Sequence, residues 1–277
     1  MNDDTHVPST PSRDRGPAIF TRYAAIGDSF TEGMADADPA RANTFVGWAD
    51  RLAVHLSAVA GQNNRSFGYA NLAVRGRLLA DIAGPQVEGA LALAPDLVSI
   101  VGGGNDILRP KADIDALAAR LEDSVAKLRA SGASVLLATP TDPREAPVLK
   151  ASRGRAATYT AHIWSIAQRH DAYVLDLWGM TALRDWRMWA PDRIHLTSEG
   201  HRRVALNAFT AMGFNAPEPD WAIPLPAAAR ISRVEAARAN AQWARQYLLP
   251  WMQRRLRGQS SGDTISAKRP TLTPLQR

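Results

Sequence analysis

The sequence predicts an α/β protein whose parallel sheet is covered by helices on both faces. Short runs of apolar and β-branched residues recur along the chain, and a longer amphipathic stretch separates each run from the next. The short runs lack the polar–apolar alternation of a half-exposed sheet, so both of their faces are expected to be buried. Strands that alternate with helices in this way are typical of right-handed crossovers between parallel neighbours.

Five segments have the length and composition of buried strands. They are residues 23–26, 69–74, 97–101, 135–138 and 173–177. Glycine or proline punctuates several of these ends: Gly27 stops the first segment, Gly102 begins a glycine run after the third, and Pro140 closes the fourth. Such residues end regular structure, which supports the division into short strands.

Five longer stretches have helical periodicity or helix-cap signals. They cover residues 44–61, 86–94, 112–130, 153–170 and 197–212. Thr44 and Thr197 are natural N-caps, and Ser131 with Gly132 ends the third stretch. Helices and strands alternate from Tyr23 to about residue 213, so we expect one domain there.

Composition excludes several classes of protein. The chain has 277 residues, 45% of them hydrophobic, and no cysteine, so disulfides, thiolate metal sites and a cysteine nucleophile are all excluded. No apolar run approaches the ~18 residues that a membrane-spanning helix needs. The first twenty residues are polar and proline-rich and lack the features of a secretory signal. We therefore expect a cytoplasmic protein.

The basic charge of the protein is concentrated near its C-terminus. Residues 230–277 contain 10 Lys and Arg but only 2 Asp and Glu, whereas the rest of the chain is nearly neutral. A nucleic-acid partner is therefore not expected for the folded body. The expected organisation is a flexible leader, a main domain, a proline-rich linker, a basic amphipathic helix and a disordered tail. These parts comprise residues 1–20, 21–213, 214–228, 229–257 and 258–277.

The basic helix expected at 229–257 has three alternative uses. Its apolar residues repeat every three or four positions, and Trp243, Tyr247 and Trp251 add aromatic area. It can contact an anionic membrane surface, bind an acidic partner or nucleic acid, or pack back on the domain or on a second subunit. The sequence leaves these alternatives and the oligomeric state open.

A serine follows the first predicted strand. Ligands of open parallel sheets bind at the carboxyl ends of the strands, so the loops there are the candidate site. Ser29, preceded by Gly27 and Asp28, is either a nucleophile or a turn residue that caps the next helix. The segment is neither the G-x-S-x-G nucleophile elbow nor a phosphate-binding P-loop.

Groups that can donate hydrogen bonds follow the second and third predicted strands. Gly76 allows close approach of its backbone N–H, and Asn105, after three glycines, supplies a neutral side-chain donor. Both are suited to stabilising an oxyanion. The alternatives are a plain turn glycine and a flexible loop with an Asx turn.

An Asp–His pair precedes the last predicted helix. Asp192 and His195, three residues apart on a tight turn, can hydrogen-bond, which would fix the imidazole as a general base. A surface pair ahead of a helix cap is the alternative. A metal site of His195, Glu199 and His201 is weaker, because it lacks a further well-placed set of ligands.

These four blocks, taken together and in this order, resemble those of the SGNH/GDSL hydrolase family over residues 21–213. The matching segments are Gly27-Asp28-Ser29, Gly76, Gly103-x-Asn105-Asp106 and Asp192-x-x-His195, with Phe30 where leucine is more usual. The resemblance implies a three-layer, flavodoxin-like α/β/α sandwich with about five parallel strands, and neither cofactor nor metal. It also implies that Ser29 is the nucleophile, that His195 is the base oriented by Asp192, and that Ser29, Gly76 and Asn105 form the oxyanion hole.

The expected function is hydrolysis of a small-molecule carboxylic ester through an acyl-enzyme. The substrate would carry a small acyl group, or be an acetylated sugar or a lipid ester. The alternatives are an acyltransferase with the same residues, or a non-catalytic docking module acting through the basic helix. Trp178, Trp186 and Trp189 either rim the substrate pocket or pack under the last helix. Arg75 and Arg77 either attract an anionic substrate or are solvated at the surface.

Overall fold

The protein is built around a six-stranded sheet with the order β5-β4-β3-β1-β2-β6. The computed structural model describes residues 17–42, 44–146, 149–228, 232–250, 253 and 262–275. The strands are β1 (Arg22–Gly27), β2 (Gly68–Asn71), β3 (Leu97–Val101), β4 (Ser134–Ala138), β5 (Tyr173–Leu175) and β6 (Arg269–Thr273). β1 to β5 are parallel, and β6 pairs antiparallel with β2. The order of the parallel strands is that of flavodoxin-like sheets, so the predicted fold class is confirmed.

All five predicted strands are present, although two end earlier than expected. β2 stops at Asn71, because the side chain of Asn71 turns back to accept a hydrogen bond from the backbone N–H of Ala73. β5 stops at Leu175, where the carboxylate of Asp176 accepts from the backbone of Gly179. Local side-chain bonds of this kind replace the sheet ladder and begin the loops.

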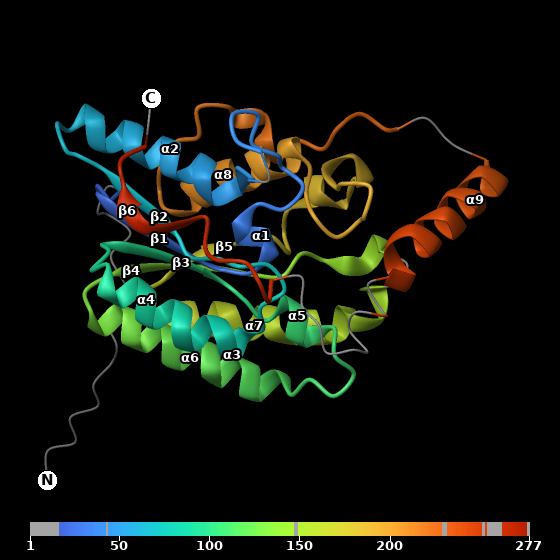
Figure 1. Cartoon of the computed structure of the whole chain (residues 1–277), viewed down its shortest axis with the longest axis horizontal. Coiled ribbons are helices and arrows are strands. Elements are labelled where there is room, and N and C mark those ends of the chain that lie inside the picture. Colours follow the sequence, from blue (N-terminus) through green and yellow to red (C-terminus); the bar gives the residue numbers. More distant parts are fainter. Residues whose placement is uncertain are drawn as a thin grey trace, which may run out of the picture.

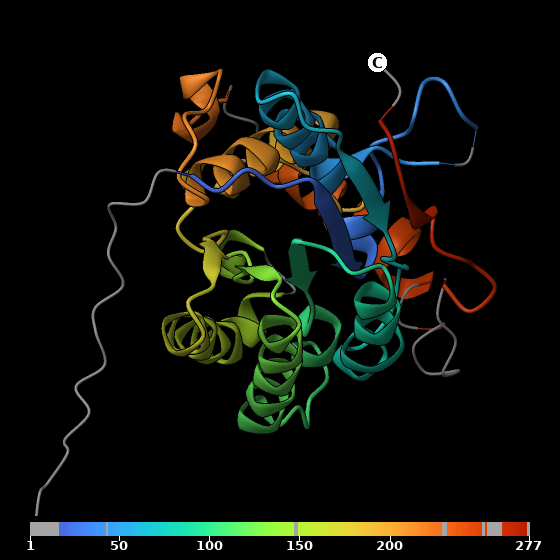
Figure 2. The ribbon, with the colours of Figure 1, turned by 90° about the vertical axis from the view of Figure 1, so that its left-hand side faces the viewer.

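Helices form a layer on each face of the sheet (Figures 1 and 2). α2 (Gly47–Gln62) and α8 (Ser198–Ala211) cover one face. The other face is covered by α4 (Val87–Ala92), α6 (Ile114–Ala130) and α7 (Arg153–Arg169).

β1 contributes side chains to the apolar clusters on both faces of the sheet. Tyr23 and Ala25 belong to the apolar cluster beneath α2 and α8, whereas Ala24 and Ile26 belong to the opposite cluster. Successive side chains of a strand point to opposite faces, so a continuous apolar run fills both layers.

The helix expected at 86–94 begins earlier and contains a wide turn. It runs from α3 (Leu79–Asp81) through a π-helical turn at Ile82–Gln86 into α4. The turn contains Pro85, which has no N–H to donate, so the wider turn accommodates a residue that an α-helix excludes. Gln86 in this turn donates to the carbonyl of Gly27 and accepts from its N–H at 2.9 and 2.7 Å, which fixes the carboxyl end of β1.

The residues after the main domain are more ordered than the sequence suggested. The expected linker forms a 3₁₀ turn at Pro219–Ala222, and Arg203 of α8 donates to the carbonyl of Ile223 at 2.6 Å. α9 (Arg233–Trp243) follows and continues into a π turn at Ala244–Leu248. Residues 1–16 of the expected leader, and most of 251–261, lie outside the described residues.

The expectation of a disordered tail at 258–277 is wrong for residues 262–275, because β6 closes the edge of the sheet beside β2 (Figure 2). The ammonium group of Lys268 explains the docking. It donates to the carbonyls of Glu32, Phe45 and Val46 and to Asp50 at 2.6–2.8 Å. These acceptors lie more than 200 residues away, so local composition gives no sign of them. Within the described residues, no helix is both apolar and long enough to cross a bilayer.

Candidate active site

Ser29 lies at the carboxyl end of β1, at the start of the short helix α1 (Ser29–Glu32). The preceding Gly27 has φ +156°, and a β-carbon there would lie 2.7 Å from both Thr31 Oγ1 and the carbonyl of Val101. Only glycine therefore fits between β1 and β3 at this point. Asp28 caps α1 by accepting from the backbone N–H of Phe30 at 3.0 Å. The strand, the glycine and the cap together place Ser29 at the edge of the sheet.

His195 lies on a tight hairpin that an antiparallel bridge between Trp189 and Leu196 closes. The N–H of Ala190 donates to the carbonyl of His195 at 2.8 Å, which narrows the hairpin further. Asp192 Oδ1 accepts from the backbone N–H groups of Ile194 and His195, both at 3.0 Å. We call residues 190–195, which carry the base that the sequence predicts, the catalytic turn. The Asx hydrogen bonds explain why an aspartate three residues before the histidine fixes its orientation.

The three side chains form one hydrogen-bonded chain. His195 Nδ1 lies 2.6 Å from Asp192 Oδ2, and His195 Nε2 lies 3.0 Å from Ser29 Oγ. A carboxylate can only accept, so Nδ1 carries the proton and Nε2 of the neutral ring accepts from the serine hydroxyl. Both members of the Asp–His pair are largely buried, with 23% and 16% of their side-chain surfaces exposed. The geometry suits removal of the hydroxyl proton by the imidazole.

The environment of Asp192 keeps it ionised. Burial alone would raise the pKa of Asp192, but the hydrogen bond and charge of His195 and two backbone N–H groups outweigh burial and lower the pKa. A carboxylate that stays charged holds the Nδ1 proton in place and stabilises an imidazolium.

The predicted oxyanion residues Gly76 and Asn105 lie on the loops that follow β2 and β3, the strands on either side of β1. Gly76 follows β2 with φ +74°, a conformation that favours glycine. Asn105 lies on α5 (Gly104–Ile107) after β3, and its Nδ2 donates to Asp28 Oδ2 at 3.2 Å and to the carbonyl of Arg77 at 3.0 Å. Asn105 therefore ties together the loops after β1, β2 and β3. An oxyanion would have to share or replace one of these two acceptors.

Asp28 is buried and hydrogen-bonds to two of the loops around Ser29. Burial raises the pKa of Asp28 to about 6, against the lowering effects of the Phe30 N–H and His195. Its two oxygens accept hydrogen bonds from the backbone N–H of Phe30 and the side-chain amide of Asn105. The side chain of Asp28 therefore links the start of α1 to the predicted oxyanion donor.

Sequence reasoning missed a buried ion pair beside Gly76. Glu32 of α1 accepts from the guanidinium of Arg75, and its Oε2 also accepts from the Arg75 backbone N–H at 2.7 Å. Only 6% of the Glu32 side chain and 17% of the Arg75 side chain are exposed. The expectation of a solvated Arg75 is therefore wrong, and its guanidinium neutralises the charge of Glu32. Nothing in the local pattern pairs residues 43 positions apart.

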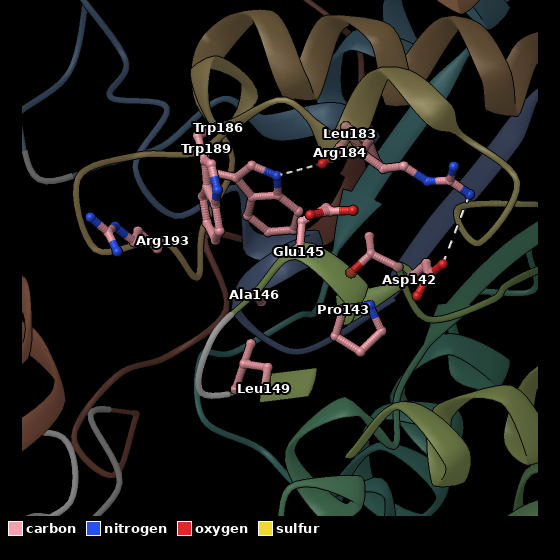
Figure 3. Close-up of a pocket in the computed structure, with 11 residues that line it drawn as sticks. Asp142, Pro143, Glu145, Ala146, Leu149, Leu183, Arg184, Trp186, Trp189 and Arg193 are labelled. Atoms are coloured by element: carbon pink, nitrogen blue, oxygen red, sulfur yellow. Dashed lines mark hydrogen bonds and ion pairs between the residues drawn. The ribbon is translucent and has the colours of Figure 1, made fainter. Parts of the chain in front are cut away.

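The three candidate tryptophans separate into two groups. Trp186 and Trp189 line a small, open pocket next to the catalytic turn, opposite Pro143 and Leu149 (Figure 3), and neither Ser29 nor His195 belongs to its lining. Trp189 also packs on the core and donates from its indole to the carbonyl of Leu183 at 2.7 Å. Trp178 packs instead on the opposite cluster, with the guanidinium of Arg153 over its ring.

The metal alternative has no support in the described part of the chain. Glu199 pairs with Arg202 and Arg203, and the buried Nε2 of His201 faces the carbonyl of Met34 at 3.3 Å. Among the described residues, no group of three or more His, Asp or Glu side chains is placed to hold a metal ion.

A serine, an imidazole and a carboxylate linked in this order at the edge of a parallel sheet are the arrangement of serine hydrolases. The model of the GDSL-like lipase/acylhydrolase family matches residues 25–203, and the chain belongs to this family. The protein is therefore an enzyme that hydrolyses ester bonds, which removes the non-catalytic docking module as an account of the chain.

Several solved structures share this fold, and two of the three that follow are named as an esterase or a hydrolase. The acetylxylan esterase Axe2 from Geobacillus stearothermophilus is 22% identical, with a TM-score of 0.57 over 74% of this chain and 98% of that one. LAE5, an alpha/beta hydrolase from the metagenome of Lake Arreo, is 23% identical, with a TM-score of 0.57 over 70% and 95%. TesA is 21% identical, with a TM-score of 0.55 over 69% and 97%. No curated protein matches the chain.

Proposed function

We propose that the protein is a serine esterase that acts through an acyl-enzyme, with Ser29 as nucleophile, His195 as base and then acid, and Asp192 as the group that orients His195. The observation that carries the proposal is the continuous chain from Asp192 Oδ2 through the imidazole to Ser29 Oγ, with links of 2.6 and 3.0 Å. Among solved forms of the fold neighbour Axe2, one catalytic mutant replaces a serine and another a histidine. Serine–histidine chemistry on this fold therefore has a precedent.

The first half of the reaction forms the acyl-enzyme. Ser29 Oγ attacks the ester carbonyl while its proton passes to His195 Nε2. The imidazolium then gives this proton to the departing alcohol as the tetrahedral intermediate collapses. Asp192 stays a carboxylate throughout, because its hydrogen bonds keep its pKa low.

The second half releases the acid. Water gives a proton to His195 Nε2 as it attacks the acyl carbonyl, and the same proton returns to Ser29 Oγ when the enzyme is freed. In both halves the backbone N–H groups of Ser29 and Gly76 and the Asn105 amide would hold the oxyanion. Loss of one such donor slows comparable enzymes about 10²- to 10³-fold.

The pocket beside the catalytic turn, whose lining includes Arg193 but neither Ser29 nor His195, is the proposed site for the part of the substrate that flanks the ester. It is bounded by two indoles and by polar groups, among them Glu145 and Arg184. Such a mixed lining fits the short acyl group or acetylated sugar of the expected substrates better than a long lipid chain.

Hydrolysis of p-nitrophenyl acetate by purified wild type, Ser29→Ala and His195→Ala tests the proposal. Both variants should lose at least about 10³-fold in kcat with their unfolding temperatures little changed. Ser165→Ala, which alters an exposed serine on α7, is the matched control and should keep wild-type activity. Full activity of Ser29→Ala would refute the mechanism. Adding a sugar or alcohol acceptor and finding a new ester as the main product would identify a transferase instead.

A further inference from the structure

The indole of Trp243 contacts the backbone of the catalytic turn. α9 stands apart from the two helical layers of the sandwich (Figure 1), yet Trp243 at its C-terminal end donates from Nε1 to the carbonyl oxygen of Asp192 at 2.9 Å. This carbonyl belongs to the peptide unit between Asp192 and Arg193, so the hydrogen bond fixes the plane of that peptide. The contact joins residues 51 positions apart in the sequence.

Arg193 makes a second link between α9 and the turn. Its guanidinium carbon lies 5.1 Å from the ring centroid of Trp243 and 5.5 Å from that of Trp186. Its Nη1 donates to Asn240 Oδ1, on the same helix, at 2.7 Å. The guanidinium of Arg193 is therefore held between the indole of Trp186, which lines the pocket beside the turn, and the indole of Trp243 on α9.

The backbone of Arg193 needs such support. Its φ is +58°, in the left-handed region that residues with a β-carbon adopt only with steric strain. Relaxation of this residue would rotate the peptide that precedes it and, with it, the carboxylate of Asp192. Asp192 in turn sets the direction of the His195 ring through the 2.6 Å hydrogen bond.

We propose that α9 is a positioning element of the active site, and that Trp243 and Arg193 hold the catalytic turn in its reactive geometry. Neither residue touches the reacting atoms. Trp243 acts through the Asp192 carbonyl, and Arg193 acts through its clamped side chain. Trp243, which the sequence made a candidate for contact with a membrane or a partner, thus faces the turn. The inference rests on the proposed roles of His195 and Asp192.

Two substitutions at position 243 separate the hydrogen bond from the aromatic contact. Trp243→Phe keeps an aromatic ring for Arg193 but removes the N–H, and Trp243→Ala removes both. A single hydrogen bond corresponds to about a three- to tenfold change in rate, so kcat should fall by this factor in the first variant and further in the second. KM for p-nitrophenyl acetate should stay within about twofold, because positioning acts on the chemical steps.

A proton resonance of His195 reports the geometry of the catalytic turn directly. The His195 Nδ1 proton, held against Asp192, should give a low-field proton resonance in the wild type. This resonance should weaken or move in both Trp243 variants. Gln242→Ala, which changes the exposed neighbour on the same helix, and Trp164→Ala, which removes an indole that is 48% exposed on α7, should leave rate and resonance unchanged.

A folded Trp243→Ala with wild-type kcat and an unchanged resonance overturns the proposal. A fall in kcat of Trp243→Ala that is no larger than the fall in the control Gln242→Ala also overturns it. If Trp243→Ala does not fold, Trp243→Phe decides by the same two measurements. Full activity in Ser29→Ala would instead show that the proposed function has failed, whatever the Trp243 variants do.

Discussion

The carboxylate of Asp28 accepts a hydrogen bond from the side-chain amide of Asn105 across 3.2 Å, and this bond joins the residue before the proposed nucleophile Ser29 to the predicted oxyanion donor. The same amide reaches the carbonyl of Arg77, next to Gly76. One asparagine therefore joins three loops that follow three different strands. The position of this side chain is fixed before a substrate arrives, as electrostatic stabilisation requires.

Replacement of Asn105 should slow catalysis without unfolding the enzyme. Asn105→Ala removes a side-chain donor that would act on the oxyanion, so kcat/KM for p-nitrophenyl acetate should fall about 10²- to 10³-fold. Asn63→Ala, at the exposed end of α2, is the control. If Asn105→Ala keeps more than a third of wild-type kcat/KM, the amide has no part in the oxyanion hole.

The buried carboxyl of Asp28 should make stability depend on pH. Burial raises its pKa to about 6, so the folded chain binds this proton more tightly than the unfolded chain, whose carboxyl has a pKa of about 4. The contribution to stability is complete below about pH 4 and is lost as the pH rises through about 6.

Asp28→Asn removes this contribution. Relative to the variant, the wild type should lose about 2–3 kcal/mol of unfolding free energy between pH 4 and pH 7. Urea titrations at both pH values measure the difference. Asp123→Asn, on the exposed face of α6, should follow the wild type. Parallel pH profiles for wild type and Asp28→Asn would show that Asp28 is not the titrating group.

The Glu32–Arg75 pair should stabilise the loop that carries Gly76. Glu32→Gln leaves the largely buried guanidinium of Arg75 without a countercharge, and breaking such a pair costs about 3–5 kcal/mol. Glu145→Gln, which breaks the exposed pair with Arg144, should cost less than about 1 kcal/mol. Urea unfolding compares the two. Equal costs would mean that burial of the Glu32 pair brings no added stability.

Lys268 should hold β6 on the sheet. Lys268→Met leaves three carbonyls and Asp50 without their shared donor, so the unfolding free energy should fall by about 3 kcal/mol or more. Hydrogen exchange should accelerate at Tyr69 and Asn71, the partners of β6 on β2. Lys111→Met, at an exposed lysine, is the control. Unchanged exchange at β2 would show that β6 stays docked without this ammonium group.

The sequence predicted the elements that local patterns determine. Apolar runs mark β1 to β5, because a buried strand needs apolar side chains on both faces. Ser29, Asp192 and His195 could be singled out because they follow strands whose carboxyl ends meet at one edge. Asp192 and His195 also interact within a single turn, so their spacing of three residues carries the information.

The contacts that the sequence did not predict are between residues far apart in the chain. Glu32 with Arg75, Lys268 with Asp50, and Trp243 with Asp192 each join segments whose own composition suggests exposed charge or a free amphipathic helix. The tail at 262–275 is rich in polar residues, yet it docks because its one buried ammonium finds four acceptors. Only the assembled sheet brings these partners together.

Detection of the acyl-enzyme shows whether Ser29 is the nucleophile. Wild-type protein mixed with p-nitrophenyl acetate and quenched in acid during turnover should carry one acetyl group, located by mass spectrometry on the peptide that contains Ser29. Ser29→Ala should carry none and Ser165→Ala should match the wild type. Turnover with no acetyl on Ser29, or with the acetyl on another residue that the reaction requires, would contradict the account.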